Sequence, residues 1–127
     1  MYGRSEDEWD DLLISGYDEL KRVARLGRTI SYTNLNSELQ RDGLRWFDFT
    51  QAKERAAMGH LLGLIVEHDQ KLHPSLMLSA IVLYHNTNDA GPGFYNLAKQ
   101  KNLFRSGESK DEFWLRQLNM VYEIFQK

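Results

Sequence analysis

The residues best suited to chemistry gather in one polar loop, which follows the apolar run from Leu76 to Tyr84. Its polar and glycine positions are His85, Asn86, Asn88, Asp89, Gly91 and Gly93. Backbone N–H groups at the start of the following helix can bind an anion, and the loop side chains can contact a ligand or a partner. The same residue types also satisfy a tight structural turn. The segment carries neither GxGxxG nor a P-loop lysine, so nucleotide binding is not specified.

The spacing of the histidines gives little support to a metal site. The four histidines are His60, His68, His73 and His85. His60 and His68 are about two helical turns apart, too far for the i, i+4 pair of helical zinc sites. His68 and His73 could meet around a helix end with Glu67 or Asp69, but histidines there also suit the helix dipole. We therefore predict no metal site and no cofactor.

Nucleophilic catalysis lacks its usual residues. The chain has no cysteine, which excludes disulfides, thiolate zinc sites and cysteine nucleophiles and fits a reducing cytosol. Ser79 lies in an apolar run without the GxSxG elbow of serine hydrolases. No pair of carboxylates sits in an apolar setting that would separate their pKa values. We therefore predict no catalytic residue.

The charge is nearly balanced overall, with 16 basic and 18 acidic side chains and a net charge of -2. Half of the 16 basic residues nevertheless fall between Lys21 and Arg55. If the helices there pack side by side, Arg25, Arg28 and Arg55 could form a face that contacts nucleic-acid phosphates. Interspersed acidic residues favour the alternative, a mixed solvated surface.

The elements expected to position these residues follow from apolar spacing. Helices are predicted from Ser5 to about Gly27, after a cap at Ser31 or Thr33, over 52–72, from Pro92 and from Ser109 to about Phe125. A short strand over 28–32 and a buried strand over 76–84 are predicted, and Gly59 and Gly63 indicate close backbone approach in the third helix. We expect a compact, mainly helical α+β domain over 1–127, with about five helices and a small two-stranded ribbon.

Three segments resemble the alkylguanine-DNA alkyltransferases and the related alkyltransferase-like proteins. Gly27–Leu35 (GRTISYTNL) is similar to that family's entry into its first recognition helix, and Arg55–Gly59 (RAAMG) to the helix start whose arginine contacts DNA. Leu78–Val82 with the following glycines falls where the family has Pro-Cys-His-Arg-Val. The resemblance implies a winged-helix-like arrangement and places Arg55 near a nucleic acid. Alkyl transfer is excluded, because the cysteine is absent.

The stretch from Pro74 to Ala98 also resembles small bacterial and phage proteins of uncharacterised activity. Our leading hypothesis is a non-enzymatic, cytoplasmic binding module from a bacterium or phage, which engages a protein or nucleic-acid partner through the 85–93 loop and adjoining helix ends. The alternative is a small ligand sensor or enzyme that uses the same loop and helix N-terminus. The acidic first residues lack a signal-peptide pattern and no apolar run reaches membrane length, so no membrane partner is expected. The residues specify neither the partner nor an oligomeric state.

Overall fold

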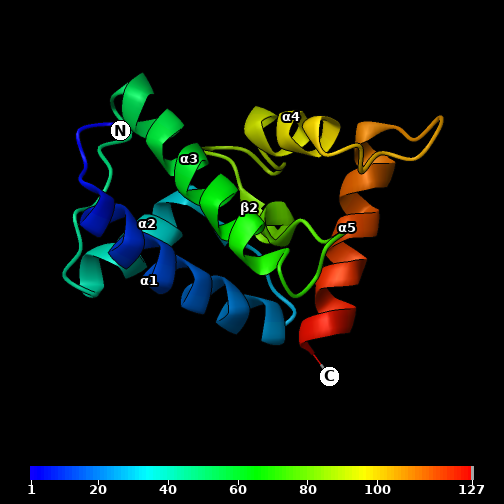
Figure 1. Ribbon diagram of the computed structural model, residues 1–127, viewed down its shortest axis with the longest axis horizontal. Coiled ribbons are helices and arrows are strands. Elements are labelled where there is room, and N and C mark those ends of the chain that lie inside the picture. Colours follow the sequence, from blue (N-terminus) through cyan, green and yellow to red (C-terminus); the bar gives the residue numbers. More distant parts are fainter. Residues whose placement is uncertain (127) are drawn as a thin grey trace.

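The chain folds into five α-helices and a small two-stranded sheet (Figure 1), in a computed structural model that describes residues 1–126. The order is α1 (Glu6–Arg25), β1 (Ile30–Ser31), α2 (Tyr32–Arg41), α3 (Ala52–Asp69), the 3-10 helix η1 (Leu78–Ile81), β2 (Val82–Leu83), α4 (Pro92–Gln100) and α5 (Lys110–Phe125). The predicted class, mainly helical α+β, is confirmed. The winged-helix-like arrangement stays a prediction.

The helix starts follow the local signals of the sequence. Ser5 and Ser109 each accept a hydrogen bond from the backbone three residues on, and a glutamate at that third position bonds back, which completes two capping boxes. Ser31 caps α2 through the Asn34 N–H, and Pro92 occupies the first turn of α4. The predicted starts at Ser5, Pro92 and Ser109 are confirmed, and of the two caps expected for α2 the structure uses Ser31 rather than Thr33. Each start depends on residues only a few positions apart.

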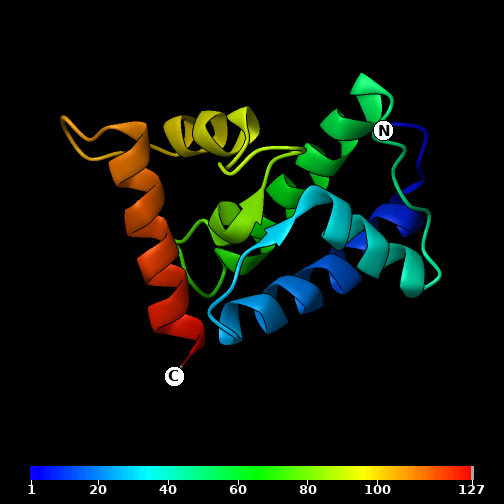
Figure 2. The same cartoon turned by 180° about the vertical axis from the view of Figure 1, so that it is seen from behind.

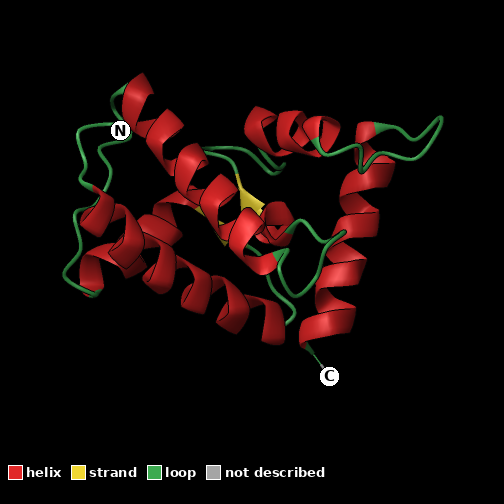
Figure 3. Ribbon diagram, viewed as in Figure 1, coloured by secondary structure: helices red, strands yellow, loops and turns green. Residues whose placement is uncertain are grey.

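The sheet pairs two strands that are far apart in the sequence. Ile30 pairs with Val82 and Ser31 with Leu83, in parallel. A parallel pair requires a long crossover, and α2 and α3 lie within it. Figure 3 shows the sheet at the centre of the molecule, and Figure 2 shows β1 running directly into α2.

The predicted strand over 76–84 is wrong for most of its length, since residues 78–81 form η1 and only Val82 and Leu83 are extended. An apolar run that is buried on all sides does not distinguish a strand from a buried helical turn. Side chains of α5 replace the missing strand partners. Gln117 Oε1 accepts from the Met77 N–H at 2.8 Å, and Trp114 Nε1 donates to the Ala80 carbonyl at 2.8 Å.

The core has two parts, which η1 joins. The larger part lies between α1, α2 and α3 and includes Leu20, Leu35 and Ile65. The 3-10 helix η1 adds Leu78 and Ile81 to it. A smaller part lies between α4, α5 and the end of α3, and its buried members include Met77, Ala80, Phe94 and Phe113. In Figure 1, α4 and α5 accordingly lie to one side of the α1–α3 unit.

The expected role of the glycines in α3 is also wrong. A Cβ at Gly63 would meet nothing within 4 Å, and one at Gly59 would meet only the Tyr32 hydroxyl, at 3.9 Å. Close approach occurs instead at Gly16 of α1, where a Cβ would lie 2.9 Å from Ile65 Cδ1. Gly59 and Gly63 therefore face α4 across a small cavity and are not in close contact with it.

No helix within residues 1–126 is both long and apolar enough to cross a membrane.

A charge at Ile81 should unfold the protein, because this side chain in η1 is fully buried, with 0% of its surface exposed. We expect Ile81→Asp to be insoluble or to lose several kcal/mol of unfolding free energy, measured by chemical denaturation. Ile14→Asp makes the same change at a side chain that is 63% exposed, and it should stay folded. A soluble Ile81→Asp protein with parental stability would contradict the described core.

Candidate functional site: a groove beside the 85–93 loop

The backbone of the loop is a tight turn held by its own hydrogen bonds. The Tyr84 N–H donates to the Asp89 carbonyl at 2.9 Å, and the Thr87 N–H donates to the Tyr84 carbonyl at 3.0 Å. The Thr87 hydroxyl donates to the same two carbonyls. Asn86 adopts a φ of 57°, a left-handed conformation that asparagine tolerates better than most residues. The loop is thus preformed, which suits both a structural turn and a rigid binding surface.

The side chains of the loop differ in their freedom. Asn86 and Asn88 are exposed, whereas His85 is half-buried and packs against Phe49 with 5.3 Å between ring centroids. Asp89 Oδ1 accepts from the Tyr95 hydroxyl at 2.7 Å. Burial is the main cause that raises the pKa of Tyr95, and the hydrogen bond to Asp89 raises it further. The Tyr95 hydroxyl therefore stays protonated and donates. Asp89 therefore anchors the loop to α4, while Asn86 and Asn88 face solvent.

Gly91 and Gly93 have different surroundings. A Cβ at Gly91 would lie 2.6 Å from Tyr84 Cδ1, so only glycine lets the chain pass the tyrosine ring. A Cβ at Gly93 would meet nothing within 4 Å. Gly91 is thus required for packing, whereas Gly93 leaves space open.

The space beside Gly93 is a groove of about 370 Å³ between α3 and the start of α4. We call it the α3–α4 groove; its lining residues are Tyr32, Ala52, Arg55, Ala56, Gly59, Tyr84, Pro92 and Gly93. A volume of this size falls in the range of small-molecule sites. The sequence predicted two of these residues as contacts, Arg55 and Gly93, but missed the tyrosines and Gly59. The predicted strands over 28–32 and 76–84 included both tyrosines, and only the structure shows that each directly follows a two-residue strand.

Tyr32 is the most buried polar group of the groove, with 4% of its surface exposed. Its ring makes an edge contact with Tyr84, with centroids 5.2 Å apart. Burial raises the pKa of Tyr32, so the hydroxyl stays protonated. A cavity of about 40 Å³ adjoins the groove and shares Tyr32, Gly59 and Gly93 with it; Ser79 lines its wall and is 5% exposed. Neither the Tyr32 nor the Ser79 hydroxyl bonds to another group of residues 1–126.

The predicted nucleic-acid contacts are not brought together. Arg25 ends α1 and Arg28 follows it, whereas Arg55 lies in the first turn of α3, at the far end of the α1–α3 unit in both views (Figures 1 and 2). Arg55 Nη1 donates to the Phe49 carbonyl at 2.6 Å. Arg28 borders a second hollow of about 360 Å³ with Arg22 and Arg41. Their contact with nucleic acid stays a prediction.

The other histidines lie among aromatic rings. His60 packs on Trp9, with centroids 4.7 Å apart, and His68 on Tyr17, at 5.1 Å. His73 Nδ1 lies 3.0 Å from Oδ1 of the buried Asp69, which also accepts from the Tyr17 hydroxyl at 2.7 Å. Among residues 1–126, no three His, Cys, Asp or Glu side chains gather as a metal site would need.

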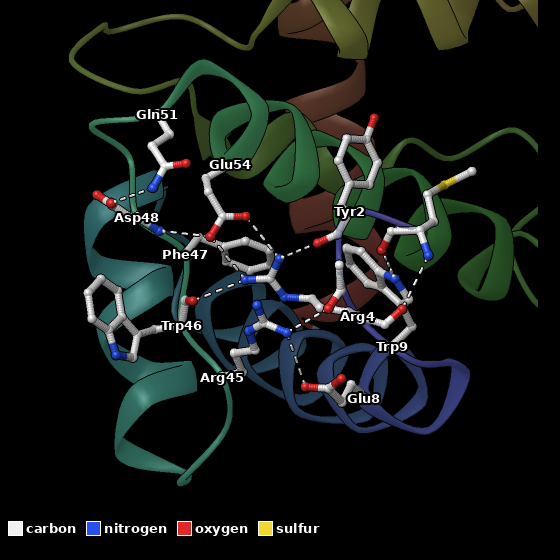
Figure 4. A network of polar contacts seen from close by, with 12 residues as sticks. Tyr2, Arg4, Glu8, Trp9, Arg45, Trp46, Phe47, Asp48, Gln51 and Glu54 are labelled. Atoms are coloured by element: carbon white, nitrogen blue, oxygen red, sulfur yellow. Dashed lines mark hydrogen bonds and ion pairs between the residues drawn. The ribbon is translucent and has the colours of Figure 1, made fainter.

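A buried ion pair fixes the end of α3 that carries Arg55. Arg4 Nη1 donates to Glu54 Oε2 at 2.9 Å and to the Tyr2 carbonyl at 3.2 Å, while Nη2 donates to the Trp46 carbonyl at 3.0 Å (Figure 4). The guanidinium also lies 4.2 Å from the centroid of the Phe47 ring. One side chain thus joins the N-terminus, the 44–51 segment and α3. No local pattern of residues predicts this network, because Arg4 and Glu54 are 50 residues apart.

No family model matches the chain, and neither a curated protein nor a solved structure matches it.

Gly91→Ala should disturb the loop, because its methyl group would clash with the Tyr84 ring. We expect a loss of about 1 to 3 kcal/mol in unfolding free energy, as for other overpacked positions. Gly93→Ala is the matched control and should be neutral or slightly stabilising, since alanine favours a helix and meets open space. Thermal denaturation of both variants checks the difference, and equal stabilities would contradict the close approach.

Glu54 should support folding in a pH-dependent way. Its hydrogen bond with Arg4 is the main cause that lowers the pKa of Glu54, so its contribution is complete above the unfolded pKa and is lost as pH falls through the lower folded pKa. We expect Glu54→Gln to cost about 3 kcal/mol at neutral pH, because Arg4 then loses its buried counter-charge.

This difference from the parent should shrink as the pH falls below about 4, where the parental carboxylate also becomes protonated. Glu123→Gln, at an exposed position, is the control and should match the parent throughout. Denaturation curves at several pH values measure the effect. A cost that stays constant down to pH values of about 2 would show that the charge of Glu54 is not what stabilises the network.

Proposed function

We propose that this chain is a binding module, bacterial or phage in origin and cytoplasmic, which engages a protein or nucleic-acid partner through the 85–93 loop and the adjoining helix ends. The observation that carries the proposal is a preformed loop with two exposed asparagines, whose ends at Tyr84 and Gly93 line the α3–α4 groove. Binding costs less when the contacting surface is already ordered. Tyr84 and Gly93 belong to both the loop region and the groove, so a partner on one would contact the other.

A second candidate function is a small-ligand sensor or enzyme that uses the same region. The specific observation in its favour is the groove, because about 370 Å³ can hold a small molecule and two tyrosines and an arginine line it. The resemblance to the alkyltransferases points instead to a nucleic acid near Arg55. A partner-capture experiment separates these candidates.

The loop asparagines should matter for binding more than for stability. We expect Asn86→Gly with Asn88→Ala to reduce partner capture at least about tenfold, while unfolding free energy changes by about 0.5 kcal/mol or less. Glycine is chosen at 86 because it accepts the positive φ there. Asp89 is left unchanged, because its bond to Tyr95 makes it structural.

The matched control is Asn102→Gly with Asn96→Ala. Asn102 has a φ of 56° and both residues are exposed, so the pair reproduces the chemical change away from the loop. Capture from bacterial lysate, with and without nuclease, is read by quantitative mass spectrometry. Loss on nuclease treatment identifies a nucleic-acid partner and retention a protein. Equal capture by both double variants would overturn the assignment of the loop.

A further inference from the structure

Two helix N-termini open onto the α3–α4 groove. Ala52, Arg55 and Ala56 come from the first turns of α3, and Pro92 and Gly93 begin α4. Neither helix has a side-chain cap: the Gln51 amide bonds to Asp48 instead, and Gly91 has no side chain. Pro92 has no N–H, and the Glu54 and Phe94 N–H groups bond to the Gln51 and Gly91 carbonyls. Among residues 1–126, the free N–H groups of these two helix starts are therefore those of Ala52 and Lys53 in α3 and of Gly93 in α4. With the partial positive charge of each helix N-terminus, these groups favour an anion.

Two hydroxyl groups add an independent observation. The side chains of Tyr32 and Ser79 are at least nine-tenths buried, line the groove or its adjoining cavity, and bond to no other group of residues 1–126. Neither hydroxyl oxygen is among the fully buried atoms that lack a partner, so both open onto the groove or the cavity. A ligand that accepts hydrogen bonds at the inner end of the groove would satisfy them.

Arg55 supplies a formal charge at the same place. Only one of its nitrogens bonds to the protein, at the Phe49 carbonyl, and no carboxylate of residues 1–126 lies within ion-pair distance of it. The other Arg side chain at this end of α3, Arg4, is by contrast paired with Glu54. Arg55 is therefore free to pair with an anionic group.

The rest of the lining is apolar and leaves room. Ala52, Ala56 and Pro92 present small apolar surfaces, and Gly59 and Gly93 present none. A bare inorganic anion would leave this apolar surface in contact with water. A ligand with an apolar body attached to its anionic group would cover it.

We propose that the groove binds a carboxylate attached to an apolar residue, namely the free C-terminus of a partner polypeptide. The carboxylate lies between Arg55, the Tyr32 hydroxyl and the two helix N-termini, and the apolar side chain lies over Gly59 and Gly93. The groove continues inward only as a cavity of about 40 Å³, which is too small for a polypeptide to pass through. A polypeptide that enters the groove must therefore end there. The proposal deepens the proposed function and rests on it, since it names what the partner presents to this surface.

N-acetyl-L-phenylalanine is the probe, because it joins a free carboxylate to an apolar side chain. We expect it to bind with a millimolar Kd and to shift the amide NMR signals of Gly59 and Gly93. N-acetyl-L-phenylalaninamide, which lacks the charge, should bind at least about tenfold more weakly. Inorganic phosphate should also bind more weakly than N-acetyl-L-phenylalanine. Equal binding of acid and amide, or tighter binding of phosphate, overturns the proposal.

Substitutions test which residues contact the probe. Arg55→Met and Tyr32→Phe should each weaken the probe several-fold, whereas Arg25→Met, which removes the same charge at the far end of the α1–α3 unit, should not. Gly59→Ala should raise the melting temperature and yet weaken the probe, because its methyl group fills the groove. Asn119→Ala is the control, since it also replaces a poor helix former by alanine, at an exposed position of α5 that lines neither the groove nor the adjoining cavity. Parallel effects of the Gly59 and Asn119 variants on binding overturn the proposal.

The capture experiment distinguishes this inference from the proposed function. If the probe fails to bind while the loop variant still loses its partner, the binding module stands and the carboxylate is wrong. If the probe binds while the loop variant captures its partner normally, the groove is a carboxylate site and the loop is not the surface that contacts the partner.

Discussion

The candidate site depends on the pairing of β1 with β2. Only two residues on each strand pair, yet they join segments about fifty residues apart in the chain. The residue after each strand is a tyrosine, so the pairing sets Tyr32 and Tyr84 edge to face beside the groove. Tyr32 also begins α2, and Tyr84 begins the loop hydrogen bonds. A shift of one residue in either strand would turn the tyrosine that follows it to the other face of the sheet, away from the other ring.

So short a sheet persists because side chains satisfy the backbone around it. Gln117 is fully buried and bonds to both the Met77 N–H and the Ser75 carbonyl, while Trp114 bonds to the Ala80 carbonyl. These α5 groups do for η1 what a neighbouring strand would do for an extended chain. The C-terminal helix therefore supports the loop and the groove from a distance, without lining either.

The sequence allowed the helices and their caps to be predicted because those signals are local. Ser5 and Glu8, or Ser109 and Glu112, are three residues apart, and their spacing alone specifies the bonds. The length of β2 and the groove were not predictable in this way. Arg4 and Glu54 are 50 residues apart, and Tyr17 and Asp69 are 52 apart, so only the tertiary fold brings them together. The loop was found by composition, but the roles of Asp89 and Gly91 required the positions of Tyr95 and Tyr84.

Gly59 and Gly63 show where local preference and the fold disagree. Each costs the helix about 1 kcal/mol relative to alanine, and no neighbouring element approaches closely enough to require it. A glycine with a packing role, such as Gly16 against Ile65, repays its cost through contact. Positions that break a local rule without such a gain are those where function is expected to override stability. Gly59 lines the α3–α4 groove, so keeping that space open is the physical reason that we assign to it.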